Sequence, residues 1–417
     1  MKPTNAGPLT GIKVLELGTL IAGPFCSRMM AEFGATVIKI EAPENGDPLR
    51  QWRVLKEGTS LWWTVQARNK KSLTLNMKDP RAQDIARQLA LDADIIIENY
   101  RPGVLEKWQL GFAQLQAINP ATIMVRLSGY GQTGPMSGMP GFGAVGEAMG
   151  GMRYVTGYPD RPPVRVGVSI GDTLAAMHGV IGAMMALRHR DVTGGRWNGT
   201  SASASAAECV AGQGQMVDVA LYESVFNVME SLVPEFDFAG VKRERTGGSL
   251  PGIVPSNTYT CADSGNIVIA GNGDAIFKRL MLAIGRNDLA EDTALVSNDG
   301  RVPRTDEIEA AISGWCSTKS IQDALAILNA ADVPVSKIYS VADMQTDPQF
   351  VARNMIEQHY FPDGTPIKLP AISPKLSLTP GQTRWLGPTL GEHNNEVLHS
   401  LGYTDEQIAQ LREQKVI

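Results

Sequence analysis

Short apolar runs alternate with longer amphipathic segments along the first part of the chain. Residues 12–17 and 36–41 have the pattern of strands, and residues 24–33 between them have the pattern of a helix with proline in its first turn. Further strands are expected at 95–97, 122–128 and 214–221. Strands that alternate with helices are typical of βαβ units, which have parallel strands and right-handed crossovers. The pattern therefore predicts an α/β protein with a parallel sheet.

One carboxylate stands between a β-type run and a helical run. Residues 163–171 predict a short strand that ends in small residues, and residues 173–190 predict a helix. Asp172 then lies at the helix N-terminus, where backbone N–H groups and the helix dipole stabilise the ionised carboxylate. Such an anion is available as a nucleophile. The alternative interpretation is an ordinary capping aspartate that does no chemistry.

The turn after the first strand lacks the glycine pattern of a dinucleotide-binding site. It carries only Gly18 and Gly23, so the middle glycine of G-x-G-x-x-G, which lets backbone approach a pyrophosphate, is missing. A formal match begins at Gly129, but Pro135 and further loop residues follow it where a helix is required. Binding of NAD or FAD is therefore disfavoured.

Three other segments are candidates for ligand contact. The basic cluster at 68–78 feeds a strand and indicates either a solvated sheet edge or a phosphate contact. Residues 99–101 follow the buried strand at 95–97, and ligands of open α/β sheets bind outside the carboxyl ends of strands. The glycine-rich segment 246–252 is interpreted as a connector or as a lid over the site.

The second half of the chain has a different organisation. Between about residues 257 and 335, a strand pair and helices at 274–284 and 320–331 predict a smaller α+β domain. Near the C-terminus, Thr404 begins a capping box and a helix that is expected to run to residue 416.

Composition narrows the class of protein. The 417 residues are 43% hydrophobic and 19% charged, with a formal net charge of −5, so no basic field exists for nucleic acid or an anionic membrane. The four cysteines are widely separated, which suggests neither a zinc site nor a disulfide framework and favours a reducing compartment. No signal peptide and no run of roughly 18 apolar residues is evident, so a cytoplasmic location is expected.

Five motifs occur in one order along the chain, at residues 15–25, 34–41, 68–72, 98–103 and 129–135. Together they resemble the class III CoA-transferases, the family of formyl-CoA transferase and carnitine CoA-transferase. This resemblance implies a large Rossmann-like CoA-binding domain at 1–222, with a surface insertion at 197–213. It further implies a linker and small α+β domain at 223–340, and a return segment at 341–417 that completes the large domain. Two such chains would form an interlocked homodimer.

The resemblance also implies site residues. The nucleophilic aspartate of the family matches Asp172, and its mobile glycine loop matches Gly247 and Gly248. Its CoA-contacting positions fall on Ile21, Ala22, Leu75, Asn76, Met77, Lys78, Asn99, Tyr100, Arg101 and Lys107. Two departures concern the phosphate contacts: Ala42 stands where formyl-CoA transferase has an arginine, and the insertion is not typical of the family.

An aspartate suits CoA transfer. Its attack on an acyl-CoA thioester gives a mixed anhydride, and the released thiolate then forms an aspartyl-CoA thioester that the acceptor acid attacks in turn. Neither a metal nor a redox cofactor is needed, and coenzyme A enters as substrate. The expected acceptor is a small mono- or dicarboxylate, with succinyl-CoA a faster donor than a fatty acyl-CoA. Candidates to bind its second carboxylate are Arg50, Arg53, Arg153 and Arg165.

Two other functions remain open at this stage. An acyl-CoA racemase of the same fold needs a second proton carrier, and residues 140–143, which match its histidine segment, contain no ionisable side chain. An inactive acyl-CoA-binding protein would have no use for an aspartate flanked by glycines. Turnover separates these alternatives.

Overall fold

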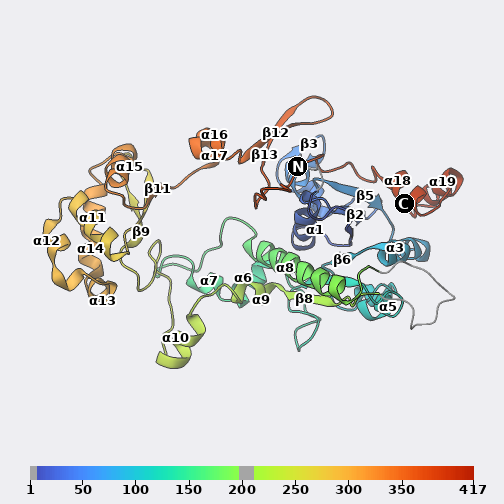
Figure 1. Ribbon diagram of the computed structural model, residues 1–417, viewed down its shortest axis with the longest axis horizontal. Coiled ribbons are helices and arrows are strands. Elements are labelled where there is room, and N and C mark those ends of the chain that lie inside the picture. The colour runs from blue at the N-terminus through green and yellow to red at the C-terminus, as the bar shows by residue number, and fades with distance from the viewer. Residues whose placement is uncertain (1–6, 197–210) are drawn as a thin grey trace. The chain divides into compact units, whose positions relative to one another are not determined.

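The computed structural model describes residues 7–196 and 211–417, which fall into two compact units (Figure 1). The first unit contains residues up to 152 together with 166–230 and 354–417. The second contains 153–165 and 231–353. Most of the insertion expected at 197–213 lies outside the described residues.

A six-stranded parallel sheet forms the centre of the first unit. Its strands are ordered β5-β2-β1-β6-β7-β8, and every neighbouring pair is parallel. This is the order of a doubly wound Rossmann sheet, with the reversal of direction between β1 and β6. The predicted α/β fold with a Rossmann-like sheet is therefore confirmed. The strands are β1 (Lys13–Glu16), β2 (Thr36–Glu41), β5 (Lys70–Thr74), β6 (Ile95–Glu98), β7 (Ile123–Ser128) and β8 (Met216–Ala220).

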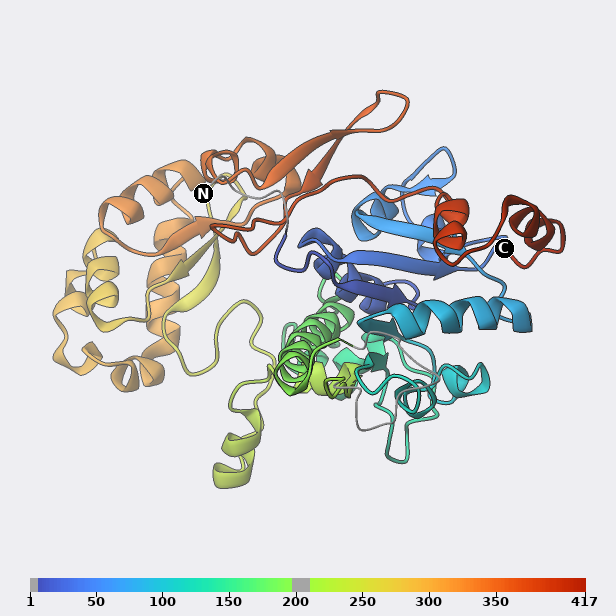
Figure 2. The ribbon, with the colours of Figure 1, turned by 45° about the vertical axis from the view of Figure 1, so that its right-hand side comes forward.

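Side chains of alternate strand residues enter two different cores. Val14 packs with helices α1 (Ala22–Glu32) and α8 (Ile170–Thr193) on one face of the sheet. Leu15 packs on the other face with α3 (Pro80–Asp92) and with two C-terminal helices, α18 (Asn394–Ser400) and α19 (Asp405–Glu413). Because side chains of a strand point alternately to opposite faces, the apolar residues of the inner strands are buried on both sides, as parallel sheets require. Figure 2 shows the strands of this sheet and the helices around them.

Helix α8 lies against the sheet through small residues. Among the described helices it alone is long and apolar enough to span a membrane, by length and composition. Yet Ala175, Ala176 and Ala183 are fully buried against the sheet. At Gly179 an added Cβ would lie 3.2 Å from both Cys26 Sγ and a Val125 methyl group, so the absence of a side chain permits this close packing. Core packing explains these buried small residues, whereas Met177, Ile181 and Met185 of the same helix are 43%, 50% and 66% exposed.

The C-terminal residues return to the sheet and cover edge strand β5. His393 N donates to Ser72 O at 3.0 Å, and Asn394 Oδ1 accepts from Thr74 N at 2.9 Å. Further along, Asn76 N donates to Val416 O at 2.8 Å. Polar groups on the open side of β5 are thereby satisfied by residues more than 300 positions away in the sequence.

Shorter elements complete the first unit. The helices are α2 (Leu61–Gln66), α4 (Val104–Lys107), α5 (Phe112–Gln116), α6 (Gly143–Met149), α9 (Leu221–Phe226) and the 3-10 helix η1 (Pro48–Gln51). Two antiparallel hairpins pair β3 (Leu55–Lys56) with β4 (Thr59–Ser60) and β12 (Ile356–Tyr360) with β13 (Pro366–Pro370). Helix α7 (Met152–Val155) begins where the chain passes between units.

The second unit has its own core of antiparallel strands and helices. Its sheet has the order β11-β10-β9, with β9 (Ser256–Thr260), β10 (Asn266–Ala270) and β11 (Val335–Lys337). Ile267, Ile269 and Phe277 are buried in its centre. The helices are α10 (Leu232–Ala239), α11 (Asp274–Ala283), α12 (Asn287–Glu291), α13 (Asn298–Arg301), α14 (Thr305–Cys316), α15 (Ile321–Ala330), α16 (Val341–Thr346), α17 (Pro348–Ala352) and the 3-10 helices η2 (Thr293–Leu295) and η3 (Val302–Arg304).

The strand expected at 163–171 is wrong. Residues 163–169, all of which the structure describes, form no strand, and helix α8 begins already at Ile170. Val164 is 48% exposed and Val168 is 59% exposed. Their β-branched side chains are typical of a strand, but a strand also needs a neighbouring strand to pair with, and a local sequence pattern does not show whether one is present.

Candidate active site

The turns after β1 and β6 meet where the strand order reverses. Asn99, directly after β6, accepts a hydrogen bond from Thr19 N at 2.8 Å and donates one to Thr19 O at 2.8 Å. Gly18 and Gly23 approach closely within the first turn: an added Cβ on Gly18 would lie 3.1 Å from the Cα of Gly23. Open α/β sheets bind ligands outside the carboxyl ends of their strands, at such a switch point. The predicted CoA-contacting residues Ile21, Asn99, Tyr100 and Arg101 lie in these two turns, and Ala22 is the first residue of helix α1.

The remaining predicted CoA-contacting positions lie at the same edge of the sheet. Residues 75–78 follow β5, two strands away from β1, and Lys107 ends the short helix α4 after β6. Lys78, Arg101 and Lys107 are exposed, as cations that meet a polyanion need to be. Leu75 is 1% exposed and packs in the core, so only its backbone is available to a ligand.

Helix α1 begins at the end of the first turn. Its first residue is Ala22, its first turn contains no acidic side chain, and among the described residues no side chain caps it. The first N–H groups of a helix lack intrahelical partners and carry the positive end of the helix dipole. An uncapped N-terminus therefore favours an anionic group such as a phosphate. The helix starts two residues before the expected Pro24, which occupies its third position.

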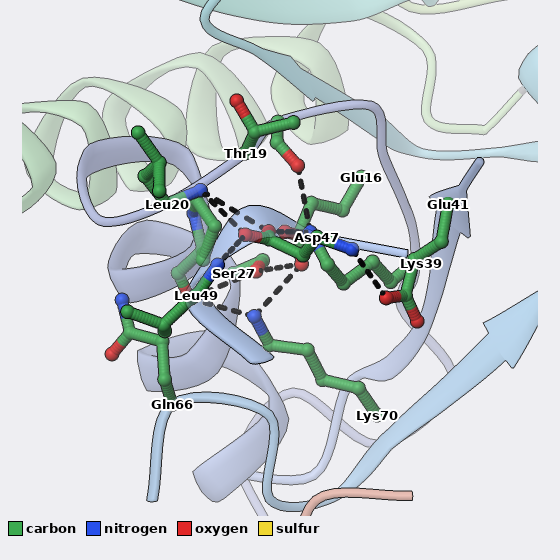
Figure 3. A network of polar contacts seen from close by, with 12 residues as sticks. Glu16, Thr19, Leu20, Ser27, Lys39, Glu41, Asp47, Leu49, Gln66 and Lys70 are labelled. Atoms are coloured by element: carbon green, nitrogen blue, oxygen red, sulfur yellow. Dashed lines mark hydrogen bonds and ion pairs between the residues drawn. The ribbon is translucent and has the colours of Figure 1, made fainter. Parts of the chain in front are cut away.

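A buried network of charges lies beneath the first turn (Figure 3). Glu16 pairs with Lys39 at 2.7 Å and with Lys70 at 2.8 Å, and Lys39 also contacts Asp47 at 2.8 Å. All four side chains are at most 2% exposed. Burial lowers the pKa of Lys70 to about 8 against the opposing effect of Glu16. Burial opposes ionisation of Asp47 too, but the adjacent Lys39 ammonium holds the pKa of Asp47 below its ordinary value.

Arg50 is part of the protein's own framework. Its guanidinium holds Glu41 through two bonds of 2.8 Å and lies 3.8 Å from the ring centroid of Trp63. It is 5% exposed, so it is not available to bind a substrate carboxylate. Arg53, by contrast, is exposed and lies over the Trp62 ring at 4.4 Å.

A second buried carboxylate holds the turn after β6. Glu98 accepts from Tyr100 N at 2.7 Å and from Arg126 Nε at 2.6 Å, and Arg126 also binds Glu106 at 2.7 Å. Burial raises the pKa of Glu98 to about 7, although Arg126 acts in the opposite direction. The chain Glu98–Arg126–Glu106 thus fixes the backbone at Tyr100 and the helix that carries Lys107.

Asp172 is the third residue of α8 and is partly buried. Its carboxylate lies against the backbone of Gly143, the first residue of α6: a Cβ on Gly143 would be 2.1 Å from Asp172 Oδ2. On the same helix, Glu147 is 1% exposed and accepts from Gly171 N at 3.4 Å. The position predicted for Asp172, in the first turn of a helix, is confirmed.

Helix α8 places Asp172 at the same edge of the sheet as the two turns. Near its C-terminus, Arg190 binds Asp94 at 2.6 Å, just before the amino end of β6. Further toward its N-terminus, Gly179 packs on Leu127 near the carboxyl end of β7. The helix therefore runs antiparallel to the strands, and its first turn, with Asp172, lies toward their carboxyl ends.

The glycine loop belongs to the second unit. Gly247 has φ +68°, a left-handed conformation that favours glycine, and its N–H donates to Gly157 O at 2.9 Å. A Cβ at this position would lie 2.6 Å from the Tyr158 ring, so the loop needs glycine for space as well. Whether Gly247 and Gly248 form a lid stays a prediction.

Reasoning from sequence found residues of the two turns and missed the buried charges beneath them. Glu16 and Lys39 are charges among the apolar residues of β1 and β2, and that anomaly is the signal that marks them. Lys70 opens the polar strand β5 and gives no such signal. Gly143 gives no such signal, because its importance arises from a contact with a residue 29 positions away.

Comparison with known proteins agrees with this geometry. The family profile described as CoA-transferase family III matches residues 9–394. The chain is 43% identical to succinyl-CoA–D-citramalate CoA-transferase of Chloroflexus aurantiacus, over 98% of both chains. It is 38% identical to the beta subunit of succinyl-CoA–L-malate CoA-transferase of the same organism, over 99% of both.

Solved structures give the same answer. A CAIB/BAIF family protein from Brucella suis superposes with a TM-score of 0.79 at 31% identity, covering 95% of this chain and 100% of that one. The profile, the full-length relatives and the superposition all point to one family. The chain belongs to CoA-transferase family III, and it is a class III CoA-transferase.

Proposed function

We propose that this enzyme transfers CoA from succinyl-CoA to a small hydroxy dicarboxylic acid of the malate or citramalate class. The observation that carries the proposal is the identity of 43% and 38%, over essentially full length, to transferases whose names specify these substrates. A dicarboxylate acceptor also agrees with the expectation that arginine binds a second carboxylate.

The mechanism we propose uses Asp172 as a covalent nucleophile. One carboxylate oxygen attacks the thioester carbonyl of succinyl-CoA, the C–S bond breaks, and CoA leaves as the thiolate from a mixed anhydride. The thiolate then attacks the aspartyl carbonyl, which releases succinate and leaves an aspartyl-CoA thioester. The acceptor carboxylate attacks this thioester to form a second anhydride and the thiolate. Attack of the thiolate on the acceptor carbonyl gives the new acyl-CoA and restores Asp172.

Several features of the first unit support this assignment. Asp172 and the turns at residues 18–22 and 99–101 lie toward the same edge of the sheet, and exposed Lys78, Arg101 and Lys107 suit the phosphates of CoA. In the proposal, Gly247 and Gly248 form the lid that excludes water from the anhydrides, and two chains form a homodimer.

The test measures CoA products by mass spectrometry after incubation with succinyl-CoA and a panel of acids. We expect malyl-CoA or citramalyl-CoA from the parent, and a loss of at least about 10⁴-fold in rate for Asp172→Ala, since covalent catalysis depends on that carboxylate. A matched control is Asp84→Asn on α3, an exposed aspartate paired with Arg87, which keeps the parent rate.

Three outcomes would contradict the proposal or part of it. If Asp172→Ala keeps the parent rate, Asp172 is not the nucleophile. If no acid accepts CoA but a chiral 2-methylacyl-CoA exchanges its α-hydrogen with deuterated water, the enzyme is a racemase instead. Faster transfer from a fatty acyl-CoA than from succinyl-CoA would overturn the choice of donor.

A further inference from the structure

The turn at residues 18–21 is held by buried or partly buried side chains from four separate segments. It has no regular secondary structure that would fix its backbone. Instead, Gly18 O accepts from Lys39 Nζ at 2.7 Å, Thr19 exchanges two bonds of 2.8 Å with Asn99, Leu20 N donates to Asp47 at 3.1 Å, and Ile21 O accepts from Gln66 Nε2 at 3.0 Å. Each of these four consecutive residues is thus held by at least one hydrogen bond from a side chain of another segment.

Asp47 makes the most demanding of these contacts. Leu20 has φ +65°, a left-handed conformation that is unfavourable for a residue with a side chain, so the surrounding structure must hold it there. Both oxygens of Asp47 accept from the Leu20 N–H at 3.1 Å, and Oδ1 also accepts from Leu49 N at 2.9 Å.

Asp47 is itself held in place. Lys39 contacts its Oδ2 at 2.8 Å and Glu16 at 2.7 Å, and Glu16 is further bound by Ser27 Oγ at 2.6 Å (Figure 3). The network therefore links the turn to strands β1 and β2 and to helix α1, and Asp47 has little freedom to follow the turn if the turn moves.

We infer that Asp47 is a positioning residue for CoA: by clamping the left-handed Leu20, it sets the backbone of Ile21 and Ala22 at the N-terminus of α1 in the arrangement that receives CoA. This inference rests on the proposed function, in which those two residues contact CoA. Asp47 acts through the turn, so its loss weakens binding of CoA and leaves the chemical step at Asp172 nearly unchanged.

The chain offers a closely matched control at the opposite edge of the sheet. Asp94 is, like Asp47, 2% exposed. It also accepts from a backbone N–H, that of Lys13 at the start of β1 at 2.8 Å, and it also binds a buried cation, Arg190, at 2.6 Å. A purely structural role for Asp47 predicts that the same substitution at either aspartate has the same consequences.

The experiment compares Asp47→Asn, Asp47→Ala, Asp94→Asn and Asp94→Ala. Titration calorimetry gives the Kd of free CoA, steady-state kinetics gives kcat and the KM of succinyl-CoA, and urea unfolding gives stability. We expect the free energy of unfolding to fall by a similar amount in the Asp47 and the Asp94 variants. We expect the Kd and KM to rise about tenfold to a hundredfold only in the Asp47 variants, the range for a hydrogen bond to a charged group, with Asp47→Asn the milder.

A fifth variant, at a different residue, covers the case in which Asp47→Ala does not fold. Gln66→Met removes the bond to Ile21 O from the other side of the turn, and we expect it to raise the Kd of CoA as well. Equal Kd values for the Asp47 and Asp94 variants, or a fall in kcat with no change in Kd, would overturn the inference while the proposed function stands. If the parent protein itself binds no CoA, both this inference and the proposed function are wrong.

Discussion

Replacing Gly143 by alanine tests how closely the position of Asp172 is fixed. The new Cβ would stand 2.1 Å from Asp172 Oδ2 and 2.6 Å from its Cγ, and its three nearest atoms all belong to that carboxylate. Ordinary contacts between such atoms are roughly 3.5 Å. The carboxylate oxygen must therefore move by at least roughly 1 Å, which side-chain rotation permits without disturbing the backbone.

The expected cost falls on catalysis. Misplacing a reacting group by roughly 1 Å lowers the rate on the order of 100-fold, equivalent to about 2.7 kcal/mol in the activation free energy. Helix propensity does not lower the free energy of unfolding of this variant, because alanine is favoured over glycine in a helix by about 1 kcal/mol. We thus expect a large loss of kcat with a retained melting temperature.

The assay follows formation of the acceptor's CoA ester from succinyl-CoA, with thermal unfolding in parallel. The matched control is Gly167→Ala, five residues before Asp172, where the described structure leaves open space around an added Cβ. A parent-like kcat for Gly143→Ala, or an equal loss for Gly167→Ala, would refute the reasoning.

Two further predictions concern buried titratable groups. Burial raises the pKa of Glu98 to about 7, whereas the unfolded chain releases this proton near pH 4.5. Between these two pH values the folded protein binds one more proton than the unfolded chain. The free energy of unfolding therefore falls by up to about 3 kcal/mol as pH rises from 4.5 to 7, and then levels off. Urea unfolding at pH 5 and pH 8 checks this, and Glu98→Gln should lack that part of the pH dependence; an identical slope contradicts it. Burial also raises the pKa of the Cys26 and Cys316 thiols, the latter to about 12, so we expect peptide mass spectrometry to find both unlabelled by a disulfide reagent at pH 8 in native protein and labelled in urea. Labelling of Cys26 in the native protein at the rate of a free thiol would show that this side chain is accessible and contradict the prediction.

Most of the sheet was predictable because its inner strands are buried on both faces. The runs at 12–17, 36–41, 95–97 and 122–128 became strands β1, β2, β6 and β7, and the run at 214–221 became edge strand β8, whose residues Met216 and Asp218 are exposed. A run of Val, Ile and Leu of that length is stable in water only when covered, and a parallel sheet covers both of its faces. The run at 163–171 has the same residue types but remains uncovered, so composition alone did not distinguish it.

The site was predictable only in part, for a related reason. Asn99 and Arg101 follow a buried strand, and a polar residue in that place is a local signal that sequence records. The role of Asp47 depends on the conformation of Leu20, and that of Gly143 depends on the packing of α6 against α8. Contacts between distant segments leave no periodicity, so they become visible only in the fold.

The covering of strand β5 by the C-terminal residues bears on the order in which the chain folds. The residues that bond to the open side of strand β5, among them His393, Asn394 and Val416, are made more than 300 residues after the strand itself. An unpaired strand edge is a template for pairing with other chains. The nascent protein therefore carries this edge exposed while the whole second unit is synthesised, and that interval is when we expect it to be most prone to aggregate.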